Sequence, residues 1–350
     1  MSSRIKELDA LRGIAALGVV LFHYTLGRAE TQYSFKLGIT GVDLFFMISG
    51  FVIFMSIQKI TSSTEFLINR FTRLYPTYWT CVTITALLQV LIYLCSSSNQ
   101  TSISLLKYLA NLTMFQHYFK INDIDGSYWT MIIELQFYLL IAFLLSLKVT
   151  KHIVPFFLLL MLMIGTYSIL LEQQFPNLNA SLTYAFRLFA HFPLFFAGIL
   201  AYNIREQKDK LYMNYLFIGL CFVIQSSLYN NSSKASSFIS QKEYIAMLGI
   251  YFTIFILFIN HKLQFIATKA TLFLGKISFA LYLIHQYIGT VVIIPLITSY
   301  IIHSFWIAAF IALLISLCLA TFITYTIEIP VGQKMNSALK SKIKLTPKDS

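Results

Sequence analysis

Charged residues are scarce in this sequence, and no stretch of it has the composition of a soluble domain. Only 11% of the 350 residues are Asp, Glu, Lys or Arg, whereas 57% are hydrophobic and the mean hydropathy is +0.72. This composition excludes an ordinary soluble globule and predicts an all-α polytopic membrane protein. The opening residues also lack the small-residue cleavage site of a signal peptide, so we expect the first apolar run to stay in the mature chain.

Cysteine is scarce as well. The four cysteines each fall in or at the end of an apolar run, without the spacing typical of a metal site. We therefore expect packing roles for Cys81, Cys95, Cys221 and Cys318. We expect no metal and no prosthetic group.

Apolar runs of membrane-spanning length recur along the whole chain. We place ten spans at residues 10–28, 38–58, 77–95, 126–147, 154–172, 184–204, 212–229, 243–260, 271–298 and 305–328. The remaining segments are short connections, apart from one longer loop between the third and fourth spans.

Basic residues are distributed unevenly between these connections. Of the 26 Lys and Arg residues, 17 fall on the same side of the membrane as the N-terminus, six fall on the other side and three lie within spans. The positive-inside rule therefore places both termini in the cytoplasm, so the net charge of +12 reflects topology and not nucleic-acid binding. We expect an integral-membrane domain over residues 1–330 and a short basic cytoplasmic tail over 331–350, which can touch anionic membrane lipid.

Two ionisable side chains share one face of the first apolar run. Arg12 lies near its start and His23 follows after three helical turns plus about 20°, roughly 16 Å along the axis. Ionisable groups in hydrocarbon rarely face lipid, so we expect this face to line a polar cavity between helices. The alternative is an Arg that snorkels at the membrane edge and a His that makes a structural hydrogen bond.

A second basic group precedes the third span, in the segment SSTEFLINRFTRLYPTYW. Ser62 and Glu65 resemble a capping box, and Pro76 is expected to end or kink the helix that they start. This predicts a short amphipathic helix at the cytoplasmic surface. Arg70 and Arg73 lie one turn apart on it, and two such guanidinium groups suit a phosphate or pyrophosphate. The alternative is that an inside loop attracts arginine for topology alone.

The fourth span carries a carboxylate. Glu134 lies about 12 Å into the membrane, on one face with Thr130 and Tyr138. A carboxylate at this depth is expected to be paired or functional. Asp43 lies at the outer end of the second span, in GVDLFFMISGF. For Trp129, next to Thr130, an ordinary interfacial aromatic is the simpler interpretation when the residue is taken alone.

The remaining polar positions lie in the second, ninth and tenth spans. Gly50 permits close helix packing. Ser278, Tyr282 and His285 recur at i, i+4 and i+7 as a polar stripe, for which interhelical hydrogen bonds are the simpler explanation. Glu328 closes the last span on the cytoplasmic side, where it can pair with Arg12 or with the segment that carries Arg70 and Arg73.

Taken in chain order, six motifs resemble the membrane-bound acyltransferase 3 family, which includes O-acetylases of bacterial lipopolysaccharide O-antigen and exopolysaccharide. They span residues 8–330 and are LDALRG with a His ten residues further on, GVDLFFMISGF, FLINRFTRLYPTYW, YWTMIIELQFY, LGKISFALYLIH and YTIEIP. The chain departs from the family pattern at Thr130 and Met131, where Ser-Leu is usual. Ile329 stands where Arg often separates Glu from Pro, which weakens any salt bridge inferred there.

This resemblance implies an O-acyltransferase, most commonly an O-acetyltransferase, in the inner membrane of a bacterial cell. It implies cytoplasmic acetyl-CoA as the donor and a hydroxyl of a surface polysaccharide or lipid-linked glycan as the acceptor. The residues implied are His23, Arg12, Glu134 and Trp129 for catalysis, Arg70 and Arg73 for the donor phosphates, and Asp43, Ser278, Tyr282, His285 and Glu328 in support.

Imidazole titrates near neutral pH, so His23 can accept the proton of a sugar hydroxyl that attacks the thioester. The sequence has no G-x-S-x-G elbow and no Cys beside a plausible base, which favours direct transfer, although an acyl-His relay stays open. The competing class is a transporter or flippase of lipid-linked glycan. Because no second copy of the pattern formed by Arg12 and His23 occurs in the later half, we favour the enzyme.

Overall fold

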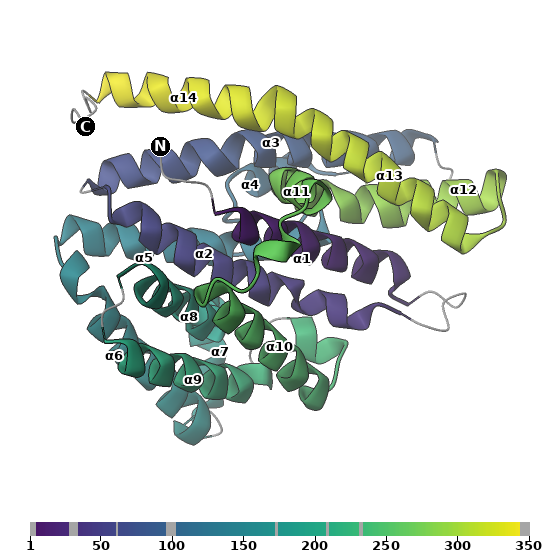
Figure 1. Ribbon diagram of the computed structural model, residues 1–350. Helices are drawn as coiled ribbons and strands as arrows, with labels where there is room; N and C mark the ends of the chain where they lie inside the picture. Colours follow the sequence, from purple (N-terminus) through teal and green to yellow (C-terminus); the bar gives the residue numbers. More distant parts are fainter. Residues whose placement is uncertain are drawn as a thin grey trace. The chain divides into compact units, whose positions relative to one another are not determined.

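The part of the chain that the structure describes consists of helices and connections, with no strand. In this computed structural model the described residues are 5–27, 34–60, 62–95, 103–171, 174–207, 210–230 and 234–343. Figure 1 shows these helices with their labels. Among the described residues, 10 helical runs are long and apolar enough to cross a membrane. These runs are Lys6–Thr25, Lys36–Ile57, Ser63–Cys95, Gly126–Ser146, Thr150–Leu171, Arg187–Glu206, Leu211–Asn230, Gln241–Ile259, Lys269–Tyr300 and Phe305–Lys342. Each predicted span coincides with one of them, and only the third and tenth runs extend far beyond the prediction.

The chain forms two compact units, which we describe separately. Unit 1 takes its described residues from Met1–Leu26, Tyr33–Ser63 and Ile133–Gly275, and unit 2 from Gly27–Gln32, Thr64–Ile132 and Lys276–Ser350. The helices of unit 1 are α1 (Lys6–Thr25), α2 (Gly41–Ile57), most of α5 (Met131–Ser146), α6 (Ile153–Thr166), α7 (Pro176–Ala185), α8 (Phe192–Tyr202), α9 (Leu211–Ser227) and α10 (Gln241–Ile259). Those of unit 2 are nearly all of α3 (Ser63–Cys95), α4 (Leu105–Leu112), most of α11 (Lys269–Tyr287), α12 (Ile294–Tyr300), α13 (Phe305–Ile323) and α14 (Ile329–Lys342).

Helices α2 and α8 form the core of unit 1 by packing backbone against backbone. A Cβ atom on Gly50 would overlap the carbonyl of Phe195, and a Cβ atom on Gly198 would overlap the carbonyl of Met47. Only glycine allows this approach, and the close packing predicted for Gly50 is confirmed. Phe195 also stacks on Phe137 of α5, with ring centroids 4.2 Å apart. Helix α5 therefore packs against the crossing of α2 and α8.

Close packing also fixes α1 within unit 1. A Cβ atom on Gly275 would overlap the carbonyl of Asp9, and one on Gly38 would overlap the carbonyl of Gly18. The helix is therefore in close backbone contact near its start and in its second half. This contact limits the rotation of α1 about its axis, and with it the direction of every side chain that α1 carries.

In unit 2, α3 is a single helix, which corrects the prediction of a separate surface helix ahead of the third span. Pro76 lies inside α3 and removes the N–H that would otherwise bond to the carbonyl of Thr72. The distant α14 packs at this point: a Cβ atom on Gly332 would lie 2.9 Å from the Thr72 carbonyl oxygen. Asn336 Nδ2 donates to Asn69 Oδ1 at 2.8 Å and to Thr72 Oγ1 at 3.0 Å.

Helix α14 begins where the sequence predicted a basic tail. It runs antiparallel to the first turns of α3 and extends the contact to an ion pair between Lys340 Nζ and Glu65 Oε1 at 2.8 Å. The tail is thus helical as far as Lys342 and packed on the third span over this length. The last residues of the predicted tail lie outside the described residues.

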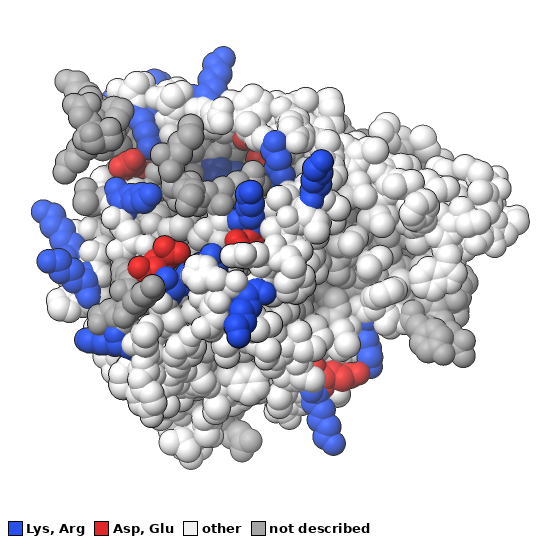
Figure 2. Space-filling view, viewed as in Figure 1, with Lys and Arg blue, Asp and Glu red and all other residues white. Residues whose placement is uncertain are grey.

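Large apolar side chains are exposed on the helices, as lipid contact requires. Leu91, Phe143 and Phe310 are 54%, 57% and 59% exposed. On the face drawn in Figure 2, uncharged residues make up most of the surface. Such an apolar surface is costly in water and favourable in hydrocarbon, which supports a multi-pass membrane protein.

Candidate active site

His23 and Arg12 lie on one continuous helix, α1, as predicted, and both side chains are half-buried. The Nδ1 atom of His23 is 3.0 Å from the carbonyl oxygen of Val19, one turn earlier. A carbonyl only accepts, so Nδ1 carries the hydrogen and the lone pair of the neutral ring is on Nε2. Phe22 packs against the imidazole ring, with centroids 4.8 Å apart. The backbone of α1 therefore sets both the tautomer and the orientation of this ring.

Glu134 accepts two hydroxyl hydrogen bonds in unit 1. Ser49 Oγ of α2 donates to Glu134 Oε1 at 3.2 Å, and the hydroxyl of Tyr138 donates to the same oxygen. Tyr138 lies one turn beyond Glu134, on the face that the sequence predicted. Ser49 belongs to the GVDLFFMISGF motif, so the second and fourth motifs meet at this half-buried carboxylate.

Asp43 has a partner that the sequence reasoning missed. Its side chain is fully buried, and Oδ1 lies 3.6 Å from Nδ1 of His191, which is 1% exposed. The ring of Phe46 packs against His191 at 4.8 Å. In the sequence, His191 is a lone histidine at the start of an apolar run, so no local pattern marks it as the partner of Asp43.

The polar stripe of α11 is buried in unit 2. Ser278 and His285 are fully buried, and His285 Nδ1 bonds back to the carbonyls of Leu281 and Tyr282 at 3.0 and 2.9 Å. The Tyr282 hydroxyl is 2.9 Å from Thr130 Oγ1. The YWTMIIELQFY and LGKISFALYLIH motifs therefore meet through a side-chain hydrogen bond.

Trp129 immediately precedes Thr130, in the 3₁₀ turn Gly126–Thr130 that leads into α5. Its side chain is 7% exposed, so the tryptophan is buried within the protein. Asp125 caps this turn: its Oδ1 accepts from Ser127 N and Ser127 Oγ, both at 2.9 Å.

The other oxygen of Asp125 reaches α11. Oδ2 accepts from the backbone N–H of Tyr287 at 2.9 Å, at the point where α11 passes into the π-helical turn Ile288–Ile293. Burial raises the pKa of Asp125 to about 6, because removal from water disfavours the charged carboxylate.

The arginine pair lies within α3. Arg70 is buried, with its guanidinium 5.4 Å from the centroid of the Phe66 ring, and Arg73 is half-buried. This corrects the expectation that both project from a surface helix, because α3 packs into unit 2 over this length. Glu328 is the last residue of the π-helical turn Thr324–Glu328 between α13 and α14, and it accepts from Thr324 Oγ1 at 3.3 Å. Its pairing with a basic residue stays a prediction.

The predicted site residues divide between the units. Unit 1 carries Arg12, His23, Asp43 and Glu134, and unit 2 carries Arg70, Arg73, Trp129, Ser278, Tyr282, His285 and Glu328. Within each unit, motifs that are far apart in the sequence share hydrogen bonds.

Comparison with known proteins identifies one family over nearly the whole chain. The sequence model of the family described as "Acyltransferase domain" (Acyl_transf_3) matches residues 5–326. Three relatives are ORF330 of Acidianus two-tailed virus, a candidate acetyltransferase by name, the peptidoglycan O-acetyltransferase OatA of Listeria monocytogenes, and the exopolysaccharide production protein ExoZ of Rhizobium meliloti.

ORF330 is 23% identical over 293 residues, which are 80% of this chain and 82% of the viral protein. OatA is 25% identical over 150 residues, 39% of this chain and 23% of OatA. ExoZ is 38% identical over 61 residues, 17% of this chain and 18% of ExoZ. The matches to OatA and ExoZ thus cover less than a quarter of those proteins. No solved structure matches the chain.

Proposed function

Because this chain belongs to the acyltransferase 3 family, we propose that it is an O-acetyltransferase that uses acetyl-CoA and acts on a cell-surface or lipid-linked polysaccharide. The names of OatA and ExoZ support a glycan acceptor, since one is a peptidoglycan O-acetyltransferase and the other an exopolysaccharide production protein. We place the protein in the inner membrane of a bacterium, with the donor on the cytoplasmic side.

The orientation of His23 is the observation that carries this proposal. With the ring hydrogen held on Nδ1 by Val19, the Nε2 lone pair takes the proton of the acceptor hydroxyl. The hydroxyl oxygen forms a bond to the thioester carbonyl carbon and the C–S bond breaks. The departing CoA thiolate then takes the proton back from the imidazolium and leaves as free thiol. His23 is thus unchanged at the end of the transfer.

Arg12 and Glu134 are assigned positioning and electrostatic roles. Arg12 places a cation on the His23 helix, where it stabilises negative charge on the substrate. Glu134 is held by Ser49 and Tyr138, so its carboxylate has a fixed direction and can orient a donor group of substrate or protein.

Arg70 and Arg73 are assigned to the donor phosphates. A guanidinium presents two parallel N–H groups to phosphate oxygens, and two arginines one turn apart suit the pyrophosphate of acetyl-CoA. Their place near the start of α3 is on the side of the membrane that the positive-inside rule assigns to the cytoplasm, where acetyl-CoA is made.

The substitution His23→Gln tests the proton transfer. Glutamine keeps a polar side chain of similar size but cannot take up a proton near neutral pH, so we expect glycan acetylation to fall by about 10²- to 10⁴-fold. Acetylation is measured by mass spectrometry of surface glycans and normalised to the amount of folded protein. A His23→Gln protein that acetylates at the unmodified rate would show that His23 is a packing residue.

The substitutions Arg70→Lys and Arg73→Ala test the donor site. Lysine keeps the charge at the buried position but not the planar fork, so each change should weaken acetyl-CoA binding by about tenfold or more, measured by calorimetry. Lys334→Ala, which removes an exposed cation of α14, is the matched control and should leave the affinity unchanged. Equal affinities in all three variants would place the donor elsewhere.

A further inference from the structure

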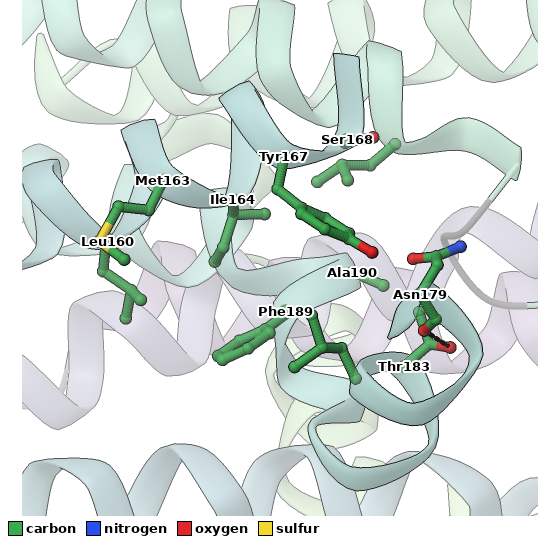
Figure 3. Close-up of a pocket in the computed structure, with 11 residues that line it drawn as sticks. Leu160, Met163, Ile164, Tyr167, Ser168, Asn179, Thr183, Phe189 and Ala190 are labelled. Atoms are coloured by element: carbon green, nitrogen blue, oxygen red, sulfur yellow. Dashed lines mark hydrogen bonds between the residues drawn. The ribbon is translucent and has the colours of Figure 1, made fainter. Parts of the chain in front are cut away.

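An apolar cavity lies within unit 1, and none of its lining residues is assigned to acetyl transfer (Figure 3). Its volume is about 260 Å³. Its walls come from α6, the π-helical turn Tyr167–Leu171, α7, the 3₁₀ turn that precedes α8 and the 3₁₀ turn that follows α9. Most of the lining side chains are apolar, and none of the lining residues is charged. The space equals about nine water volumes of about 30 Å³ each, which suits a single extended hydrocarbon chain.

The cavity has a polar end and an apolar end. In Figure 3 the hydroxyl of Tyr167 points toward the α7 side chains Asn179 and Thr183, whereas Leu160 and Met163 lie at the other end. Amide and hydroxyl groups without a charge suit ester or hydroxyl oxygens better than a phosphate, which attracts arginine and lysine. The lining therefore fits an apolar chain with neutral ester or hydroxyl groups at its polar end, and it has no group that would hold a phosphate.

The cavity lies where candidate spans end. The run Thr150–Leu171 ends close to Tyr167, the run Arg187–Glu206 begins beside Phe189, and Leu228 lies two residues before the end of Leu211–Asn230. Consecutive spans alternate in direction, so these three ends lie on the same side of the membrane. The cavity is thus near the boundary between hydrocarbon and headgroups, on the side that the sequence predicts to be outside.

The lipid-facing surface continues into the cavity. Met163 lines it and is also 61% exposed, and its neighbours Leu159 and Leu162 on α6 are 58% and 42% exposed. Helix α7, which forms another wall, has no buried residue. A hydrocarbon chain can therefore move from the bilayer along α6 into the cavity without crossing a polar surface.

We propose that this cavity binds one acyl chain of a bilayer phospholipid. The chain lies against Leu160 and Met163, and the ester groups lie near Tyr167 and Asn179, at the depth where a phospholipid in the bilayer carries them. The bilayer supplies this ligand at very high local concentration, and the apolar surface that leads to the cavity is the surface that such lipids already cover. None of the lining residues takes part in the proposed acetyl transfer, and the lipid proposal does not depend on that activity.

The test is photolabelling of the full chain in nanodiscs of phosphatidylethanolamine and phosphatidylglycerol. A small fraction of the phosphatidylethanolamine carries a diazirine in its acyl chain, and labelled peptides are mapped by mass spectrometry. We expect the lining segments of α6 and α7 to be labelled above exposed sites such as Phe310. Leu160→Trp fills the cavity and should abolish this labelling, whereas Leu159→Trp, on the exposed face of the same helix, should leave it unchanged.

A second filling variant, Leu182→Trp on α7, covers the case in which Leu160→Trp does not fold. Absence of labelling above the exposed sites in the unmodified protein overturns the proposal. So does equal labelling in the filling variants and in Leu159→Trp. A polyprenyl phosphate that carries the same diazirine is tested in parallel. Labelling by that probe and not by the phospholipid would assign the cavity to a lipid carrier and refute the phospholipid assignment. None of these measurements involves acetylation, so they are independent of the proposed activity.

Discussion

At the scale of single residues, Asp125 links two helical segments of unit 2 that are far apart in the sequence. One carboxylate oxygen caps the turn that carries Trp129, and the other accepts the N–H of Tyr287. This one carboxylate accepts from the backbone N–H groups of Ser127 and Tyr287 and from the Ser127 hydroxyl, so these buried donors are paired. Burial of the same group nevertheless makes its charged form costly.

The pH dependence of stability follows from this cost. The pKa of Asp125 is raised from 3.8 to about 6, so the folded chain binds this proton more tightly than the unfolded chain. The group therefore favours the folded state below about pH 4, and this contribution, roughly 3 kcal/mol, is lost as the pH rises through about 6. Between these pH values the unmodified protein should lose stability relative to Asp125→Asn, which does not titrate. Thermal unfolding in detergent at several pH values checks this, and parallel curves for the two proteins would contradict it.

At the scale of helices, close backbone packing distinguishes the glycines at the α2–α8 crossing from a glycine of α9 that has no close neighbour. Gly50 and Gly198 face the partner helix so closely that no Cβ atom fits. Gly219, inside α9, has open space where its Cβ atom would be. The α2–α8 crossing thus depends on residues that are unfavourable in an isolated helix.

Alanine at these positions should therefore have opposite effects. Gly50→Ala and Gly198→Ala force the backbones of α2 and α8 apart and should destabilise the protein by about 1–3 kcal/mol. Gly219→Ala should stabilise it by about 0.5–1 kcal/mol, because alanine is the better helix former and meets nothing. Unfolding in detergent with increasing denaturant measures both. A stabilising Gly50→Ala would refute the crossing as described.

At the scale of the whole molecule, the uneven distribution of Lys and Arg predicts the orientation in the membrane. Helix α10 offers a direct comparison, because Lys242 at its start and Lys262 just after its end are both exposed. By the positive-inside rule, Lys242 faces outside and Lys262 faces the cytoplasm.

Cysteine labelling at these two positions tests the topology. The exposed cysteines Cys95 and Cys318 are first replaced by serine. In intact cells, an impermeant maleimide should then label Lys242→Cys and not Lys262→Cys, which should react only after the cells are opened. The reverse pattern would invert the predicted topology, and with it the side on which the donor binds.

The sequence alone determined the ten spans, because each depends on the length and polarity of one continuous segment. For the same reason it placed Arg12 with His23 on one helix, and Ser278, Tyr282 and His285 on another. Helical periodicity relates residues within a few turns of each other, and it needs no tertiary information.

Only the tertiary structure decided the pairings between segments. The sequence predicted that Pro76 would end or kink a surface helix, but α3 continues past Pro76 as one helix. Helix α14, more than 250 residues later, packs beside the turn of α3 that precedes this proline. The sequence also did not reveal that His191 faces Asp43 or that Asp125 accepts the N–H of Tyr287. These contacts depend on how helices pack side by side, and hydropathy and periodicity contain no information about which helix faces which.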